Sequence, residues 1–532
     1  MASSLDETIE ASTRGGIFLL FGNVAANLIL AVGLLIIPRL LGSDQYGLYT
    51  LSFVLPSLLI LFVDLGINAG LVRYCAQFIS KGEEDKAAKF IQKGLLFEVI
   101  VSIIIFAISF SFADYFATYL LNRPDAGYYI RLVSLTIPFQ ILFATASSIF
   151  VGIGKMKNVA IIATLQAFTK VSVSIVLVLL AFGVSGALIG QVAGYLIAAT
   201  TGVVLILKVY YNQTKKGDQE QTSFKDISKT LIRYGFPLYI SAILGGFVPQ
   251  YQGVVLAWFV SNAEVGNLRA TTNLLTILVM VTGPIGTTLF PAFSRLDSNG
   301  EEIKKFYQMA VKYTTLLIIP AAILLLVLSK EVVRIAYGST YASAPLYLSA
   351  YCASYVLVGL GSLVQSQLFN GTGNTWMTLK TLLVTLTLVM PLTPILASIY
   401  GVLGLIVAHV ASNMIGTLYG FSLVRSRFKI RLFSQTLLRI YIVSAVAAFP
   451  VLVLLAISPL WWLLNAIIGA AIYLFIVLTL VPLSRILQAS ELQKIEALLR
   501  RIAILEKMLK PITSYEGKLI KRKTRTASKP ET

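Results

Sequence analysis

Charged residues are scarce in this sequence. Asp, Glu, Lys and Arg make up 13% of the 532 residues, whereas hydrophobic residues make up 57%. A soluble domain carries about 25% charged residues. The chain therefore lacks the polar residues that a water-facing surface would need over most of its length, and we expect lipid to surround it instead.

Residues that bind metals or perform catalysis are also scarce. The chain has one histidine, His409, and two cysteines, Cys75 and Cys352, with no CxxC pair. This excludes a disulfide framework, and it excludes a histidine-based metal site or catalytic triad within one chain. No Walker A pattern is present. We therefore expect no catalytic residue, no metal and no cofactor.

Long apolar runs are abundant. A membrane-spanning helix needs about 20 mostly apolar residues, whereas the strands of a membrane barrel have about 10 and alternate in polarity. The runs here have helical length, and an acidic leader before the first one argues against a signal peptide. We predict an all-α polytopic membrane protein with about fourteen transmembrane helices. They start near residues 16, 48, 94, 132, 159, 186, 234, 267, 313, 346, 376, 403, 438 and 461.

The positive charges alternate between the predicted loops. Net charge is +19, which in a soluble protein would suggest nucleic acid. Here, however, 36 of the 43 Lys and Arg residues lie in the N-terminus, the tail and the loops after even-numbered spans, and 6 lie in the loops after odd-numbered spans. The positive-inside rule then places both termini in the cytoplasm of a multi-pass cell-membrane protein. We expect no nucleic-acid partner.

The sequence contains an internal repeat. Gly47 and Gly266, Lys93 and Lys312, and the glycine pairs beginning at Gly152 and Gly371 are each separated by 219 residues. Six spans per repeat give both halves the same orientation, related by a pseudo-two-fold axis along the membrane normal. The predicted divisions are a cytoplasmic N-terminus (1–14), two six-helix bundles (15–209 and 231–424) joined by a linker (210–230), two extra spans (425–482) and a basic tail (483–532).

The tail has an amphipathic pattern. Apolar residues recur at spacings of three and four at Ile495, Leu498, Ile502, Leu505, Leu509 and Ile512, with basic residues between them. Such a helix can lie on the anionic inner leaflet or pair with another helix. Since this apolar face is shorter than three heptads, we favour a helix on the membrane surface over a coiled coil.

Lys170 is the clearest candidate for a functional residue. It lies near the middle of a predicted span, with Gln166 four residues before it and Ser174 four residues after it, so the three form one polar stripe on a helix. An ionisable group inside a membrane is costly and usually functional. We predict that Lys170 and Gln166 bind an anionic substrate; the alternative is a structural ion pair between Lys170 and Glu98.

Three other spans carry polar groups that we predict to bind substrate. Arg269 and Asn273 are four residues apart on one span, although Arg269 could instead extend to the membrane surface. Asn23 and Asn27 have the same spacing on the first span, where hydrogen bonds between helices are the alternative.

A third span combines Gln250, another predicted substrate-binding residue, with Pro249. Proline removes one helical hydrogen bond and kinks a helix. We therefore predict a hinge at Pro249.

Several motifs together resemble one transporter family. Arg39-Leu40-Leu41-Gly42 is followed by Tyr46-Gly47-x-Tyr49, then by Asp64-Leu65-Gly66 running to Arg73, and later by a Gly-x-Gly-Lys turn ending at Lys155. Over about residues 12 to 485, the chain resembles the polysaccharide-transporter branch of the multidrug/oligosaccharidyl-lipid/polysaccharide exporter superfamily. The drug-antiporter branch is less similar, because it usually has an acidic residue in the first span and residues 16–37 contain none.

The resemblance implies a V-shaped pair of six-helix bundles that works by alternating access. It implies that the cargo is a lipid-linked oligosaccharide flipped to the outer leaflet, with glycan-assembly proteins as candidate partners. Because such a cargo carries a polyprenyl phosphate or diphosphate, Arg73 joins Lys170 and Arg269 as a candidate ligand. Two alternatives stay open: a cation-coupled multidrug exporter, and a membrane-embedded glycosyl- or phosphotransferase.

Overall fold

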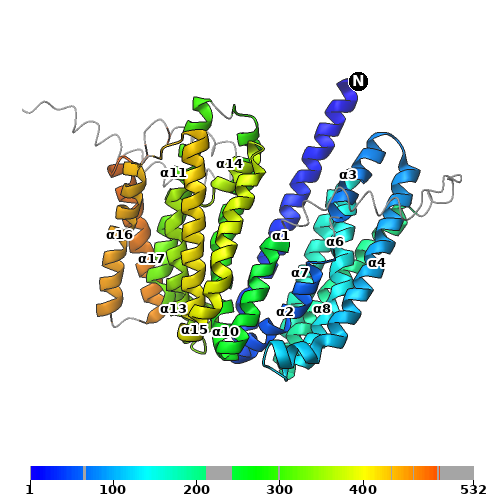
Figure 1. Cartoon of the computed structure of the whole chain (residues 1–532), viewed down its shortest axis with the longest axis horizontal. Coiled ribbons are helices and arrows are strands. Elements are labelled where there is room, and N and C mark those ends of the chain that lie inside the picture. The colour runs from blue at the N-terminus through cyan, green and yellow to red at the C-terminus, as the bar shows by residue number, and fades with distance from the viewer. Residues whose placement is uncertain are drawn as a thin grey trace, which may run out of the picture. The chain divides into compact units, whose positions relative to one another are not determined.

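The computed structural model describes residues 2–63, 67–210, 243–297, 300–432, 434–458, 461–487 and 491, and Figure 1 shows their arrangement. Within these ranges all regular structure is helical and no strand occurs. The prediction of an all-α fold is therefore confirmed. Asp64 and the predicted linker beyond Tyr210 lie outside the described residues, as do the tail residues after Glu491.

The chain divides into two compact units. Unit 1 comprises residues 1–270 and 339–341, and unit 2 comprises residues 271–338 and 342–532. Unit 1 contains α1 (Ala2–Ser52), α2 (Val54–Ile60), α3 (Ile67–Ser80), α4 (Glu84–Tyr115), η1 (Phe116–Leu120), α5 (Ala126–Ser134), α6 (Thr136–Gly152), α7 (Met156–Leu177), η2 (Val178–Phe182), α8 (Gly183–Tyr210) and a helix over residues 243–259.

The helix α10 (Asn262–Ser294) begins in unit 1 and continues into unit 2. The rest of unit 2 contains α11 (Glu301–Val327), α12 (Ser329–Tyr337), α13 (Ala344–Cys352), η3 (Ala353–Leu360), α14 (Gln365–Gly371), α15 (Thr375–Phe428), α16 (Ser434–Ile457) and α17 (Trp462–Leu483). Its core joins α10, α11, α15, α16 and α17, so the two helices predicted as extra spans pack within this unit.

Eight helical segments of the described residues are long and apolar enough to cross a membrane, or nine if one bent pair, Ala344–Leu360 with Gln365–Gly371, forms a single span. The chain is therefore a multi-pass membrane protein. Two of the segments have 53 and 54 residues, far more than the roughly 20 that a bilayer requires. The predicted number of fourteen spans stays a prediction.

Each of these two long segments is an antiparallel hairpin. Gly186, Gly190 and Gly194 of α8 approach Leu177, Ser174 and Lys170, in reverse order along α7. The break falls at Gly183, which has φ 53° and ψ −132°. The second half of α15 likewise folds back on the first after Gly401, which has φ 56° and ψ −133°. Side chains strongly disfavour this backbone conformation, so both positions require glycine.

The closest helix crossing in unit 1 joins α1 to the beginning of α10. A Cβ atom on Gly47 would clash with the Asn262 carbonyl, and one on Gly266 would clash with the Ser43 carbonyl. The contacts are reciprocal, since 43 and 262 differ by the same 219 residues as 47 and 266. Small residues allow membrane helices to approach this closely.

We expect Gly47→Ala to destabilise the protein by roughly 1–3 kcal/mol, the usual cost of inserting atoms into a packed interior. Gly245→Ala is the matched control, because a Cβ there would meet no atom within 4 Å. Thermal unfolding of detergent-solubilised protein measures both. Equal midpoints for the two variants would show that the crossing is not tightly packed.

Candidate functional site

The polar stripe predicted on α7 faces two different environments. The Ser174 hydroxyl donates a hydrogen bond of 3.0 Å to the Ala187 carbonyl of α8, and Gln166 is buried. A Cβ on Gly194 would lie 2.8 Å from the Lys170 Cβ, so α8 packs tightly against the base of this lysine. Ser174 therefore holds the hairpin together, and Lys170 is the member of the stripe with a half-buried, partly accessible side chain.

The Lys170 ammonium forms no hydrogen bond and no ion pair with any residue that the structure describes. In particular, it forms no ion pair with Glu98, which lies fully buried on α4. An unpaired ammonium inside an apolar bundle raises the free energy of the folded protein. The predicted alternative of a Lys170–Glu98 ion pair is therefore not formed among the described residues.

A second cation lies close to Lys170. Arg269, an exposed residue of α10, is near enough to repel the ammonium electrostatically, and both residues belong to unit 1. Like charges are unfavourable neighbours in a medium of low dielectric constant. Folding brings these two cations within electrostatic range of each other from positions 99 residues apart in the sequence.

Two tyrosines complete the surroundings of this pair. Tyr49 of α1 lies near both Arg269 and Tyr195 of α8. The Tyr49 ring stacks on Tyr46 with centroids 5.5 Å apart, and Tyr195 packs edge-on against Phe143 at 5.8 Å. Tyr49 belongs to a motif of the family resemblance, but nothing in the sequence singled out Tyr195 as a site residue.

The two predicted asparagines lie on the helix beside α7. Gly22 and Gly33 of α1 contact Ala160 and Val171 of α7, so the two helices run parallel with a constant offset. By this offset Asn27 lies five residues before the level of Lys170, or about 7 Å along the axis. Asn23 lies one turn further away, and both asparagines are exposed.

The other predicted site residues are more dispersed. Arg73 is exposed on α3, where its guanidinium lies 5.7 Å from the Tyr74 ring centroid. That helix packs mainly on α4 and α6. Asn273, one turn after Arg269 on α10, is buried.

Pro249 and Gln250 lie on the helix over residues 243–259, with Pro249 exposed and Gln250 half-buried.

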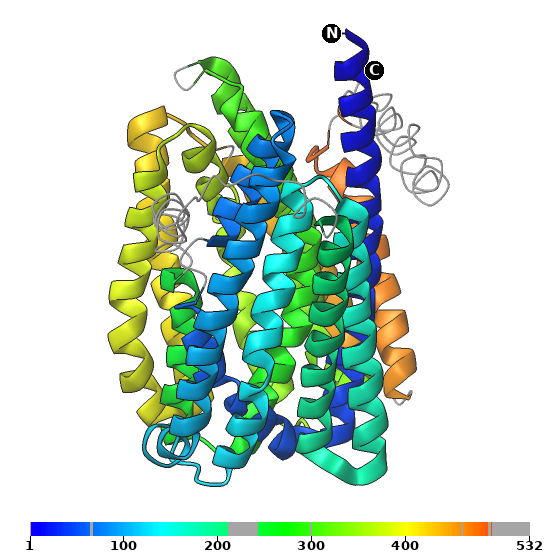
Figure 2. The ribbon, with the colours of Figure 1, turned by 90° about the vertical axis from the view of Figure 1, so that its right-hand side faces the viewer.

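Figure 2 shows unit 1 from the side, with α1 in dark blue running beside the helices of the α7–α8 hairpin.

This arrangement is suited to binding an anion. Lys170 and Arg269 supply ammonium and guanidinium donors, which form strong charge-assisted hydrogen bonds with phosphate oxygens. The described residues contain no group of three His, Cys, Asp or Glu side chains that could hold a metal ion.

Comparison with known proteins identifies the family. The family model described as "Polysaccharide biosynthesis protein" matches residues 12–297, more than half of the sequence. The chain belongs to the polysaccharide biosynthesis protein family, which confirms the resemblance noted in the sequence.

Two curated relatives have similar coverage. The chain is 22% identical over 347 residues to the probable low-salt glycan biosynthesis flippase Agl15 of Haloferax volcanii, covering 65% of this chain and 67% of the relative. It is 24% identical over 352 residues to the lipopolysaccharide biosynthesis protein WzxC of Escherichia coli, covering 65% and 68%.

Among solved structures, the chain is similar to a lipid II flippase MurJ in an inward closed conformation. The TM-score is 0.67 at 17% identity, and the match covers 87% of this chain and 98% of that one. A multidrug resistance MATE family transporter of the MOP superfamily, in an inward-facing conformation, gives a TM-score of 0.57 at 18% identity, covering 76% and 94%. At these identities the likeness shows a shared fold.

We expect Lys170→Met to leave the unfolding midpoint unchanged or to raise it, because the substitution removes a charge that no described residue balances. Lys312→Met is the matched contrast. Lys312 lies on α11 of unit 2, just before a predicted span, and its ammonium is 2.7 Å from the Glu491 carboxylate. Its loss should lower the midpoint, since the carboxylate would keep its charge without its partner.

Thermal unfolding of the two purified variants in the same detergent checks this contrast. A lower midpoint for Lys170→Met, comparable to that of Lys312→Met, would assign Lys170 to the packing of the bundle.

Proposed function

We propose that this protein is a flippase that moves a polyprenyl-linked oligosaccharide or polysaccharide precursor from the cytoplasmic to the outer leaflet, for cell-surface glycan assembly or protein glycosylation. One observation carries the proposal. In a chain of the polysaccharide biosynthesis family, a half-buried Lys170 forms no ion pair with any described residue and lies within electrostatic range of Arg269.

The chemistry of such a cargo fits the site. In such a cargo the phosphate or diphosphate carries the negative charge. It joins an apolar polyprenyl chain to a hydroxyl-rich glycan. Its phosphate oxygens would balance Lys170 and Arg269 where water is scarce and electrostatic attraction is strong. Tyr49 adds a phenol hydroxyl and an aromatic face near Arg269, and Tyr195 lies near Tyr49.

The relatives support the same cargo class. Agl15 is described as a glycan biosynthesis flippase, WzxC as a lipopolysaccharide biosynthesis protein, and the MurJ of Bacillus subtilis as a lipid II flippase. A cationic drug, in contrast, would be repelled by the charge of the Lys170–Arg269 pair. The chemistry therefore favours the glycan flippase over the drug exporter and over an enzyme, which would need reactive groups that this site lacks.

Alternating access is the mechanism that we propose for the two predicted six-helix repeats. The reciprocal contact of Gly47 and Gly266 supports a pseudo-two-fold relation between them, because both members of each repeat-related pair meet there. Pro249 is the proposed hinge, and Asn23, Asn27 and Gln250 are proposed to contact the sugar or the phosphate. Glycan-assembly proteins are proposed partners.

We expect Lys170→Gln to reduce flipping of a lipid-linked oligosaccharide by at least about thirtyfold, corresponding to about 2 kcal/mol, the low end for losing one member of a close charge pair. Lys170→Arg should keep part of the activity because it keeps the charge. Arg269→Gln should act in the same direction. Initial rates in reconstituted vesicles measure these effects.

Lys304→Gln is the matched control, since Lys304 pairs with the exposed carboxylate of Glu301 at 2.6 Å, far along the chain from the site. It should flip cargo at the wild-type rate. Full activity of Lys170→Gln at normal expression would remove this lysine from cargo binding. Faster export of a cationic drug by the same variant would favour the multidrug exporter.

We also propose that both termini are cytoplasmic and that the basic side of the tail contacts anionic inner-leaflet lipids. The uneven distribution of Lys and Arg between alternate predicted loops supports this orientation. Reporter fusions at Met1 and Thr532 should therefore both report a cytoplasmic location. A fusion pair with one end inside and the other outside would require an odd number of spans.

A further inference from the structure

Arg123, in the first sequence repeat, holds a connection that belongs to the second. Its guanidinium donates hydrogen bonds of 3.0 Å to the side-chain oxygen of Asn262 and 2.7 Å to the Val260 carbonyl. Close by, the indole N–H of Trp258 donates a hydrogen bond of 2.7 Å to the Leu120 carbonyl. Hydrogen bonds from a charged donor are stronger than those between neutral groups. The connection that precedes α10 is therefore tied to the connection that precedes α5.

A second contact repeats the first with the two repeats exchanged. The hydroxyl of Tyr341, a buried residue, donates a hydrogen bond of 2.6 Å to the Pro38 carbonyl of α1. Subtracting the repeat offset of 219 from 341 gives 122, next to Arg123, and adding it to 38 gives 257, three residues before Val260. Each repeat thus uses the loop after its third predicted span to hold the end of the first span of the other repeat.

These contacts lie at one end of an antiparallel helix pair in unit 1. Where Gly47 crosses at Asn262, the pair begins, and glycines of the helix over residues 243–259 then approach the other helix in reverse order. The further contacts are Gly253 with Val54 and Gly246 with Leu61. Leu51 is four residues beyond Gly47 on the same helix face and is fully buried. The two repeats therefore meet along a tightly packed interface, with the hydrogen bonds at its end.

This end of the interface is the one that the charge distribution places outside. All four segments that form the contacts follow odd-numbered predicted spans, whose loops hold few Lys and Arg residues. A transporter with alternating access has to open its outer end before cargo can enter the outer leaflet. Opening here requires the segments of the two repeats to separate.

The contacts are also connected to the cargo site through α10. Asn262, Gly266 and Arg269 are at positions i, i+4 and i+7, so they lie on one face of this helix. The distance from Asn262 to Arg269 along the axis is about 10 Å. A helix movement that follows ligand binding at Arg269 would thus reach the residue that Arg123 holds.

We propose that Arg123 and Tyr341 form a reciprocal latch, defined by their bonds to Asn262, Val260 and Pro38, that keeps the outer end closed. Release of the cargo to the outer leaflet requires both contacts to break. The identity of that cargo rests on the proposed function, whereas the opening movement does not depend on it.

Thiol labelling of Leu51→Cys in detergent-solubilised protein tests the latch without any cargo. The two native cysteines are buried, as is Leu51, so a water-soluble maleimide reacts with position 51 only when the interface opens. Arg123→Gln combined with Tyr341→Phe should raise the labelling rate at least about tenfold, because each lost hydrogen bond shifts the equilibrium toward the open form. Each single substitution should give a smaller increase.

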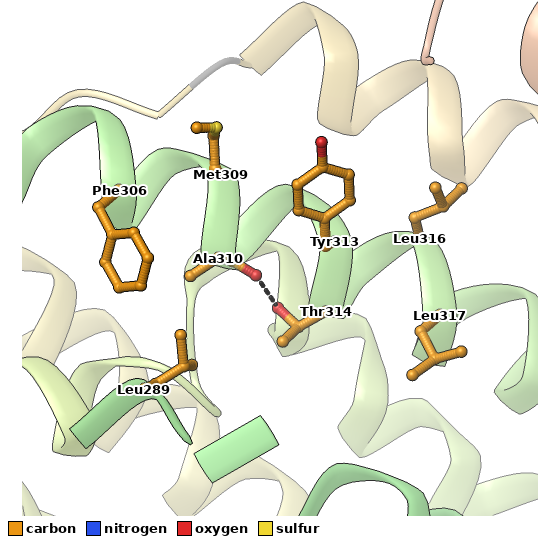
Figure 3. Close-up of a pocket in the computed structure, with 8 residues that line it drawn as sticks. All are labelled: Leu289, Phe306, Met309, Ala310, Tyr313, Thr314, Leu316 and Leu317. Atoms are coloured by element: carbon orange, nitrogen blue, oxygen red, sulfur yellow. Dashed lines mark hydrogen bonds between the residues drawn. The ribbon is translucent and has the colours of Figure 1, made fainter. Parts of the chain in front are cut away.

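Met309→Cys is the control for general loosening of the protein. Met309 is 40% exposed and lines an apolar groove of about 530 Å³ on α11 of unit 2, shown with Phe306 and Tyr313 in Figure 3. Its labelling rate should be the same with and without the latch substitutions. Size-exclusion profiles of all variants verify that they fold.

A reversible crosslink tests the latch during transport. Arg123→Cys with Asn262→Cys, joined by a short bis-methanethiosulfonate, should flip lipid-linked oligosaccharide at less than a tenth of the rate of the same protein after reduction, because a closed gate stops the cycle. The matched control pair is Glu301→Cys with Lys304→Cys, within one turn of α11. Its crosslink should leave the flipping rate unchanged.

The two readouts separate the latch from the cargo. Unchanged labelling of Leu51→Cys in the double variant would overturn the latch, and so would full flipping by the crosslinked protein. An equal rise at Met309→Cys would assign Arg123 and Tyr341 to general packing and overturn it as well. Faster labelling of Leu51→Cys, together with no flipping by any variant or by the wild type, would support the latch and overturn the proposed cargo.

Discussion

The membrane excludes water from the polar groups of this chain, and the rest of the structure depends on how they are satisfied without it. Hydroxyl side chains bond back to the carbonyl one turn earlier, as Ser52 does to Leu48 at 2.7 Å and Thr393 does to Val389 at 2.6 Å. Glycines then let helices approach until little space is left between them, as Gly47 and Gly266 do. In such a bundle a charge without a partner stands out, because the local rule is that polar groups are paired.

Lys312 and Lys170, each at least half-buried, show both outcomes. Lys312 is buried beside the Glu491 carboxylate, and its energetic cost is offset by an ion pair with two short N–O distances. Lys170 has the Arg269 guanidinium as its charged neighbour instead, which raises the free energy further. The Glu491 carboxylate balances the charge of Lys312, whereas no described residue balances the charge of Lys170.

Sequence reasoning predicted local features well, because they depend on local chemistry. Apolar runs predicted the helices, and the repeated Gly-x-Gly turns have second glycines, Gly154 and Gly373, with φ of 74° and 76°. Helical periodicity also placed Gln166 and Ser174 on the face of Lys170, but it could not show that α8 covers part of that face. Tyr195 was missed for the same reason, since only helix packing brings it near Tyr49.

The helix α10 carries Arg269, the close crossing at Gly266 and the boundary between the two units. Gly266 lies at the close crossing with α1, Arg269 follows one turn later, and the boundary between the two units falls after Ala270. A ligand bound by Arg269 therefore acts on a helix that belongs to both units. A ligand can shift a conformational equilibrium only by its difference in affinity between the states. If movement of α10 changes the distance between Arg269 and Lys170, an anion that requires both cations supplies such a difference, whereas a ligand of one cation does not.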